Sequence, residues 1–155
     1  MTRDEGGSDS RYEKLNNTGR FRPGALKHIF EGELNGGIAS GYHYEGIPNT
    51  PGRLVPGTET FPDRNGVYRG KVTVHGIRKP ANRGKSSFFP NSMSPQDVVD
   101  GINEAYGRRR FIWGNTYEGE TLLGMRISMR LDKAGKIISA YPVYDGLEEG
   151  ISWLG

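Results

Sequence analysis

The sequence predicts an α+β fold in which one helix packs on a twisted antiparallel sheet. The first observation behind this prediction is a β-hairpin: residues 122–131 and 136–144 are strand-like and flank a short turn that contains Gly135. The second is a single strong helix pattern over residues 94–107, set among strand-like segments. Because helices and strands do not alternate regularly in the second half, the sheet is expected to be antiparallel rather than parallel.

The helix over residues 94–107 has recognisable signals at both ends. Ser94 can cap its first turn, Pro95 suits the first helical position, and Asp97 stands where its carboxylate can bond back to the cap. Gly107 is expected to end the helix. The apolar stripe that would face the sheet is Val98, Val99, Ile102, Ala105 and Tyr106. In the hairpin that follows, the alternating residues expected to face inward are Met125, Ile127, Met129 and Leu131.

The first part of the chain divides into an arm and the start of the domain. Residues 1–17 are polar and without period, so we predict a flexible linker or arm there and a single folded domain over 18–155. Within 20–34 a short helix is expected, with Pro23 near its first turn and Gly32 at its end.

The middle of the chain is expected to be mostly extended. Residues 41–44 are assigned to a short strand or extended loop, and the four prolines of 47–65 predict an ordered loop without regular structure. Residues 67–75 alternate as a strand in which Gly70 breaks the parity, which predicts a bulge. Residues 86–90 are expected to be briefly extended, with Phe88 and Phe89 in the core.

Composition restricts the class of protein. A chain of 155 residues has the length of one domain. Its mean hydropathy is −0.67, and it contains no apolar run long enough to span a membrane. The absence of cysteine removes disulfides and thiolate chemistry. The net charge is +3, and basic residues cluster at 78–85 and at 108–110. Such clusters suit contacts with a phosphate backbone, although the cluster at 108–110 could equally form a protein interface.

Two of the three histidines, His28 and His43, lie in one glycine-rich segment. Imidazoles exchange protons near neutral pH, so a pair of them can serve as general acid and general base without a metal. A zinc site would need a third ligand, for which His75 or Glu31 is available, but neither stands at a recognised spacing. We therefore expect proton-transfer chemistry, with no metal and no cofactor.

Four segments carry a resemblance to a known family: HIFEGELN, GYHYEG, KSSFFPNSMSPQDVVDGINEAY and ISAYPVY. In this order and spacing they resemble the bacterial EndoU-type ribonuclease domain, over about residues 20–144. The resemblance implies an EndoU-like small nuclease fold, with short N-terminal helices followed by the twisted sheet. It also implies the site residues: catalytic His28, His43 and Lys85, and substrate-binding Ser139 and Tyr141.

The roles of these residues follow from the chemistry of RNA cleavage. Attack by the ribose 2′-OH needs a base, an acid and a cation for the charge that develops on the phosphate. By resemblance His43 is the base and His28 the acid, while Lys85 is the expected cation and Lys79 the alternative. Ser139 and Tyr141, two residues apart on a strand, would face one cleft and contact the nucleobase.

The resemblance also carries biological expectations. It implies a metal-independent endoribonuclease that leaves 2′,3′-cyclic phosphate ends, with tRNA among its candidate substrates. It implies a monomeric toxin module of a larger exported protein of contact-dependent growth inhibition, acting in the target-cell cytoplasm. Its partners would be RNA and a cognate immunity protein, without membrane contact. Two alternatives stay open: a metal-dependent hydrolase, and a non-catalytic RNA-binding module.

Overall fold

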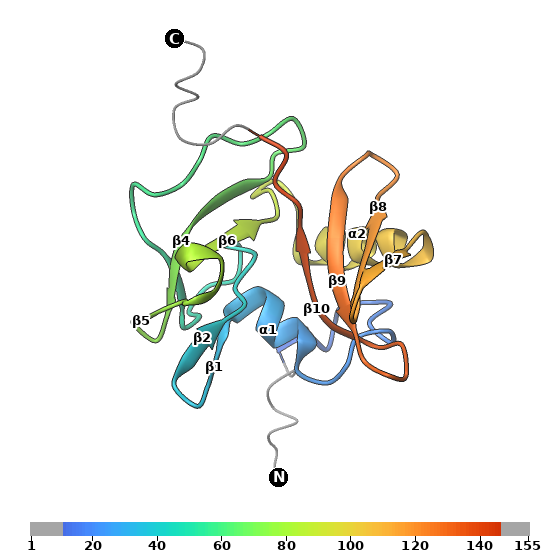
Figure 1. Ribbon diagram of the computed structural model, residues 1–155, viewed down its shortest axis with the longest axis horizontal. Coiled ribbons are helices and arrows are strands. Elements are labelled where there is room, and N and C mark those ends of the chain that lie inside the picture. The colour runs from blue at the N-terminus through green and yellow to red at the C-terminus, as the bar shows by residue number, and fades with distance from the viewer. Residues whose placement is uncertain (1–10, 147–155) are drawn as a thin grey trace.

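The structure, a computed structural model, describes residues 11–146 and confirms the α+β class (Figure 1). The elements run in this order: α1 (Ala25–Glu31), β1 (Glu33–Asn35), β2 (Ile38–Ser40), β3 (Gly52–Leu54), β4 (Tyr68–Val74), β5 (Ile77–Arg78), the 3₁₀ turn η2 (Ala81–Gly84), β6 (Lys85–Phe88), α2 (Pro95–Gly107), β7 (Arg110–Trp113), β8 (Thr116–Glu120), β9 (Arg126–Leu131) and β10 (Ile137–Pro142). The described residues form three sheets rather than the one expected: two four-stranded sheets flank α1, and β1 pairs with β2 in a small two-stranded sheet (Figure 1). No helix among these residues is long and apolar enough to cross a membrane.

The C-terminal sheet has the strand order β10-β9-β8-β7, and every pairing in it is antiparallel. It contains the predicted hairpin, whose Ile127 and Met129 are completely buried. The helix α2 packs on this face, so closely that a Cβ at Gly119 would lie 2.0 Å from the carbonyl oxygen of Ala105. The other face of the sheet is therefore left to form the site.

The helix α2 begins as the sequence predicts. The hydroxyl of Ser94 accepts a hydrogen bond from the backbone N–H of Asp97, and the Asp97 carboxylate accepts one from the backbone N–H of Ser94. This reciprocal cap satisfies two N–H groups that the first turn leaves without helical partners, and such caps contribute about 1 kcal/mol. The start of α2 is thereby fixed at Pro95.

The second sheet is built around β4, which pairs with β3, β5 and β6. The bulge expected at Gly70 is wrong, because the β4–β6 register runs through that residue without a shift. Gly70 instead faces the interior, where a Cβ would lie 2.3 Å from Leu54 Cδ1. Gly70 therefore allows close packing against Leu54 and does not interrupt the hydrogen bonds between β4 and β6.

Six of the described strands do not follow from the sequence prediction: β1, β2, β3, β5, β7 and β8. The hairpin of β1 and β2 and the strand β7 have no clear alternation of apolar and polar residues, and all four residues of β7 are exposed. The strand β3 lies inside the proline-rich segment 47–65, so the expectation of no regular structure there is wrong at Gly52–Leu54. Neighbouring strands, rather than local sequence, stabilise these segments.

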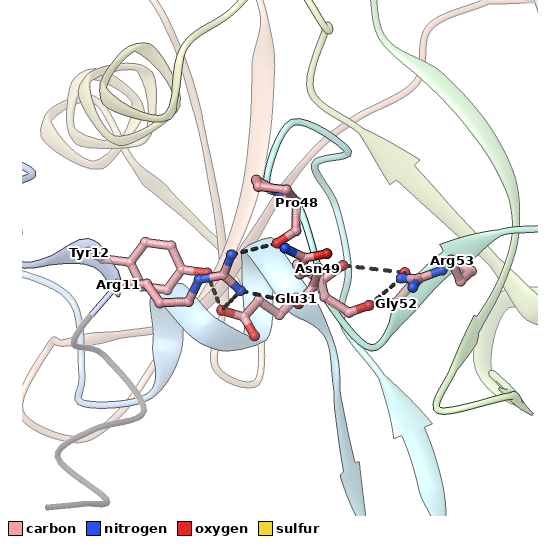
Figure 2. A network of polar contacts seen from close by, with 8 residues as sticks. Arg11, Tyr12, Glu31, Pro48, Asn49, Gly52 and Arg53 are labelled. Carbon is pink, nitrogen blue, oxygen red and sulfur yellow. Dashed lines mark hydrogen bonds and ion pairs between the residues drawn. The ribbon is translucent and has the colours of Figure 1, made fainter.

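The segment that begins at Arg11 is attached to the domain (Figure 2). Tyr12 is buried, and its hydroxyl donates to the carboxylate of Glu31 on α1. Arg11 lies 3.3 Å from the same carboxylate and also donates to the carbonyl of Pro48. The arm expected over 1–17 lies partly outside the described residues, and its described portion packs on the core.

Candidate active site

A cavity of about 450 Å³ opens between the two sheets, where β6 of one approaches β10 of the other. All of the site residues predicted from the sequence line it, together with the alternative cation: His28, His43, Lys79, Lys85, Ser139 and Tyr141. They come from α1, the loop after β2, the turn before η2, and strands β6 and β10. The fold thus brings together segments more than a hundred residues apart in the chain.

His43 is held by three hydrogen bonds. Its backbone N–H donates to the carbonyl of Ile29 on α1 at 2.7 Å, and its carbonyl accepts from the N–H of Phe89 at 2.9 Å. Its ring Nδ1 lies 2.8 Å from the carbonyl oxygen of Ser87. Because a carbonyl can only accept, Nδ1 carries the proton in the neutral ring and Nε2 keeps a lone pair.

The pKa of His43 is lowered well below its usual value. Burial is the largest cause, because it penalises the charged ring, and the positive charge of Lys79 adds to it. The hydrogen bond to the Ser87 carbonyl opposes both effects without reversing them. At neutral pH His43 is therefore an uncharged imidazole, the form that can accept a proton.

The buried neutral ring of His43 predicts a pH dependence of stability. The unfolded chain binds a proton on this residue near pH 6.5, whereas the folded chain resists it, so the free energy of unfolding should decrease as pH falls from 6.5 through the lower folded-state pKa. The slope from this one group approaches about 1.4 kcal/mol per pH unit. Denaturant unfolding of the wild type and of His43→Gln from about pH 4.5 to 7.5 measures it. Equal pH slopes in the two proteins would contradict the prediction.

His28 lies on α1 with its ring centroid 6.4 Å from that of His43. Its Nδ1 is 3.6 Å from Glu33 Oε1, and interaction with His28 is the largest cause that lowers the pKa of Glu33. Gly41 allows the approach of the next loop: its φ is +82°, and a Cβ there would lie 2.3 Å from the His28 carbonyl oxygen. The two imidazoles are thus close enough to act on one substrate group.

The two candidate lysines differ in burial. Lys79 is only 7% exposed, and its Nζ donates to Ser86 Oγ at 2.8 Å, which in turn donates to the carbonyl of Gly41 at 3.0 Å. Burial, with a smaller effect of the Arg69 charge, lowers the pKa of Lys79 to about 8. Lys85 is half-buried at the start of β6 and lines the same cavity. Of the two lysines, Lys79 is the one whose charge lowers the pKa of His43.

Ser139 and Tyr141 lie on the same side of β10 and both line the cavity. Ser139 is 5% exposed, and the Tyr141 ring stacks on that of His43 with centroids 5.2 Å apart and planes inclined by 25°. Tyr141 therefore covers one side of the His43 ring within the cavity.

Several residues of the cavity were missed from the sequence. They are Arg69 on β4, Ser86 on β6, Glu118 on β8 and Arg130 on β9. Arg130 could have been found from the sequence: it lies between Met129 and Leu131, which are predicted to face inward, so its side chain must point to the opposite face of the sheet. None existed for Glu118, since its strand was not predicted.

The residues suggested for a third metal ligand do not join the histidine pair. His75 lies at the β4–β5 turn and lines a separate hollow with Arg53. Glu31 is engaged by Tyr12 and Arg11. Across residues 11–146 no group of three or more His, Cys, Asp or Glu side chains is placed to hold a metal ion.

An open cleft with two imidazoles, buried and half-buried ammonium groups and arginines is the arrangement expected of an enzyme that acts on phosphodiesters. The chain belongs to the bacterial EndoU nuclease family, whose model matches residues 24–144. It is similar to a Bacillus cereus protein named "Toxin", with 53% identity over 129 residues. That similarity covers 83% of this chain and 24% of the relative, so the chain spans about a quarter of the relative's length. No solved structure matches the chain.

Proposed function

We propose that the chain is an endoribonuclease that cleaves RNA by attack of the ribose 2′-OH on the adjacent phosphate, without a metal ion. The observation that carries the proposal is the meeting of His28, His43 and Lys79 at one cleft. The reaction requires a base, an acid and a fixed cation, and the cleft supplies one side chain for each. The other cations around the cleft favour a polyanionic substrate.

His43 is the proposed general base. Its lowered pKa keeps the ring uncharged at neutral pH, and its proton on Nδ1 leaves Nε2 to take the proton of the 2′-OH. The oxygen then bonds to phosphorus as the bond from phosphorus to the 5′-oxygen breaks, which leaves a 2′,3′-cyclic phosphate. His28 is the proposed acid that protonates the departing 5′-oxygen.

Lys79 is the proposed cation, in place of Lys85. A buried ammonium beside the base acts in a low-dielectric setting, where charge stabilisation is stronger than at a solvated lysine. Its hydrogen bond to Ser86 also fixes its position before the substrate arrives. Lys85 would contact a phosphate further out, and Ser139 and Tyr141 would hold the nucleobase by a hydroxyl contact and by stacking.

Incubation of the purified chain with total RNA, with and without EDTA, tests the proposal against its alternatives. Equal cleavage in both buffers is expected. Loss of cleavage on chelation would favour a metal-dependent hydrolase, and RNA binding without cleavage in any buffer would favour a non-catalytic module. Single-stranded DNA of the same sequence is the matched substrate control, because it lacks the 2′-OH.

We further propose that the domain is the toxic part of a larger exported protein, acts in the cytoplasm of a target cell, and is inhibited by a cognate immunity protein. The support is the similarity to a protein named as a toxin, of which this chain covers one quarter. An acidic immunity protein would complement the cations of the cleft. Induced expression in a bacterium should arrest growth, whereas expression of His43→Ala should not.

A further inference from the structure

The wall of the cleft formed by β10 continues across the whole C-terminal sheet. Paired residues of adjacent antiparallel strands point to the same face. One such row of paired residues runs from the site to the sheet edge: Tyr141 on β10, Ser128 on β9, Glu118 on β8 and Arg110 on β7. Three steps of about 4.8 Å place Arg110 about 14 Å from Tyr141 along this face.

This face is open because α2 occupies the other one (Figure 1). Gly119, which neighbours Glu118, contacts α2 through its backbone, so Glu118 points away from the helix. Glu118 lines the catalytic cleft and also lines a second cavity of about 280 Å³. The two hollows are therefore adjacent parts of one surface.

Three of the six residues that line the second cavity are arginines. Arg108, Arg110 and Arg126 surround it, together with Glu118 and Glu120. Arg126 lies 3.9 Å from Glu118 and offsets its charge. Arg108 and Arg110 are exposed, and neither forms an ion pair with another of the described residues. Their guanidinium groups are thus available to an anion arriving from solvent.

We infer that this arginine-lined hollow binds the phosphates of RNA nucleotides that flank the cleavage position. The inference rests on the proposed ribonuclease function and extends it, because it makes the substrate a single strand that runs from the cleft to β7. Guanidinium groups bind phosphate in a bidentate geometry that lysine cannot provide. Contacts of this kind depend on the backbone and not on the base, so they should strengthen binding of long RNA without altering the base preference.

The test is the double variant Arg108→Ala/Arg110→Ala on two substrates: a dinucleotide, and a single-stranded RNA of about twelve nucleotides with the same dinucleotide at its centre. For the long RNA, kcat/KM should fall about 10-fold, mainly through KM. For the dinucleotide it should stay the same. The salt dependence should also weaken. Because two phosphate contacts are lost, the negative slope of log(kcat/KM) against log[salt] should become smaller in magnitude by about 1.4.

The matched control is Arg64→Ala/Lys133→Ala, which removes the same charge from exposed residues that line neither cavity and should behave as the wild type. Equal activity of the arginine variant and the wild type on the long RNA would overturn the inference, as would an equal loss on both substrates. If the wild type cleaves neither substrate, the proposed function itself fails.

Discussion

Replacement of His43 by alanine is expected to reduce RNA cleavage by about 10²–10⁴-fold. The imidazole is the one group in the cleft that burial keeps uncharged at neutral pH and whose free nitrogen can accept the 2′-OH proton. Water that fills the space would be a far weaker base. The same substitution at His28 should cost a similar factor, because it removes the acid. The measurement is the single-turnover rate on a defined RNA.

Structural damage must be separated from loss of chemistry, because His43 is 4% exposed and packs against Tyr141. His43→Gln keeps a polar side chain of similar size, and circular dichroism with thermal unfolding shows whether each variant folds. His75→Ala is the matched control, since that histidine lines a separate hollow. A folded His43→Gln protein that cleaves RNA at the wild-type rate would contradict the assignment of the base.

Loss of the Lys79 ammonium is expected to have an effect nearly as large. Lys79→Met keeps the apolar stem in its buried position and removes only the charge, so the rate should fall about 10²–10³-fold, the range for loss of one fixed group that stabilises developing charge. Lys85→Met removes the same charge from the edge of the same cleft and should cost less than about 10-fold. Cleavage rates of the two variants under one set of conditions provide the comparison. The reverse order of effects would restore Lys85 as the cation.

The fold could be predicted from the sequence where local signals and burial agree. The helix α2 has a complete cap and an apolar stripe, and β9 alternates at Ile127, Met129 and Leu131, so the helix and the hairpin both follow from the sequence, although β9 begins at Arg126 rather than at residue 122. The strands β1, β2, β3 and β7 are short, and several of their residues are exposed, so their pairing depends on neighbours distant in the chain. At Gly70 the broken alternation predicts a bulge, whereas in the structure the glycine makes room for Leu54.

The sequence indicates which residues form the candidate site better than it indicates their charges and pKa values. Ser139 and Tyr141 could be placed together because residues two apart on a strand share a face. The preference for Lys79 could not be found in this way, since burial and the hydrogen bond to Ser86 arise only when the β5–η2 turn folds against β6. The row from Tyr141 to Arg110 could not be predicted either, because it depends on the pairing of β7 and β8, two strands that the sequence does not indicate.

The central claim is that His28, His43 and Lys79 act together on one RNA phosphate through the neighbouring 2′-OH. The most direct measurement is mass spectrometry of the products from an RNA oligonucleotide cut in the presence of EDTA, beside the same oligonucleotide with a single 2′-deoxyribose at the cleavage position. The account predicts 2′,3′-cyclic phosphate ends from the first and no cut at that position in the second. Cleavage of the deoxy-substituted strand at the same position, or products with a 5′-phosphate and a free 3′-hydroxyl, would contradict it.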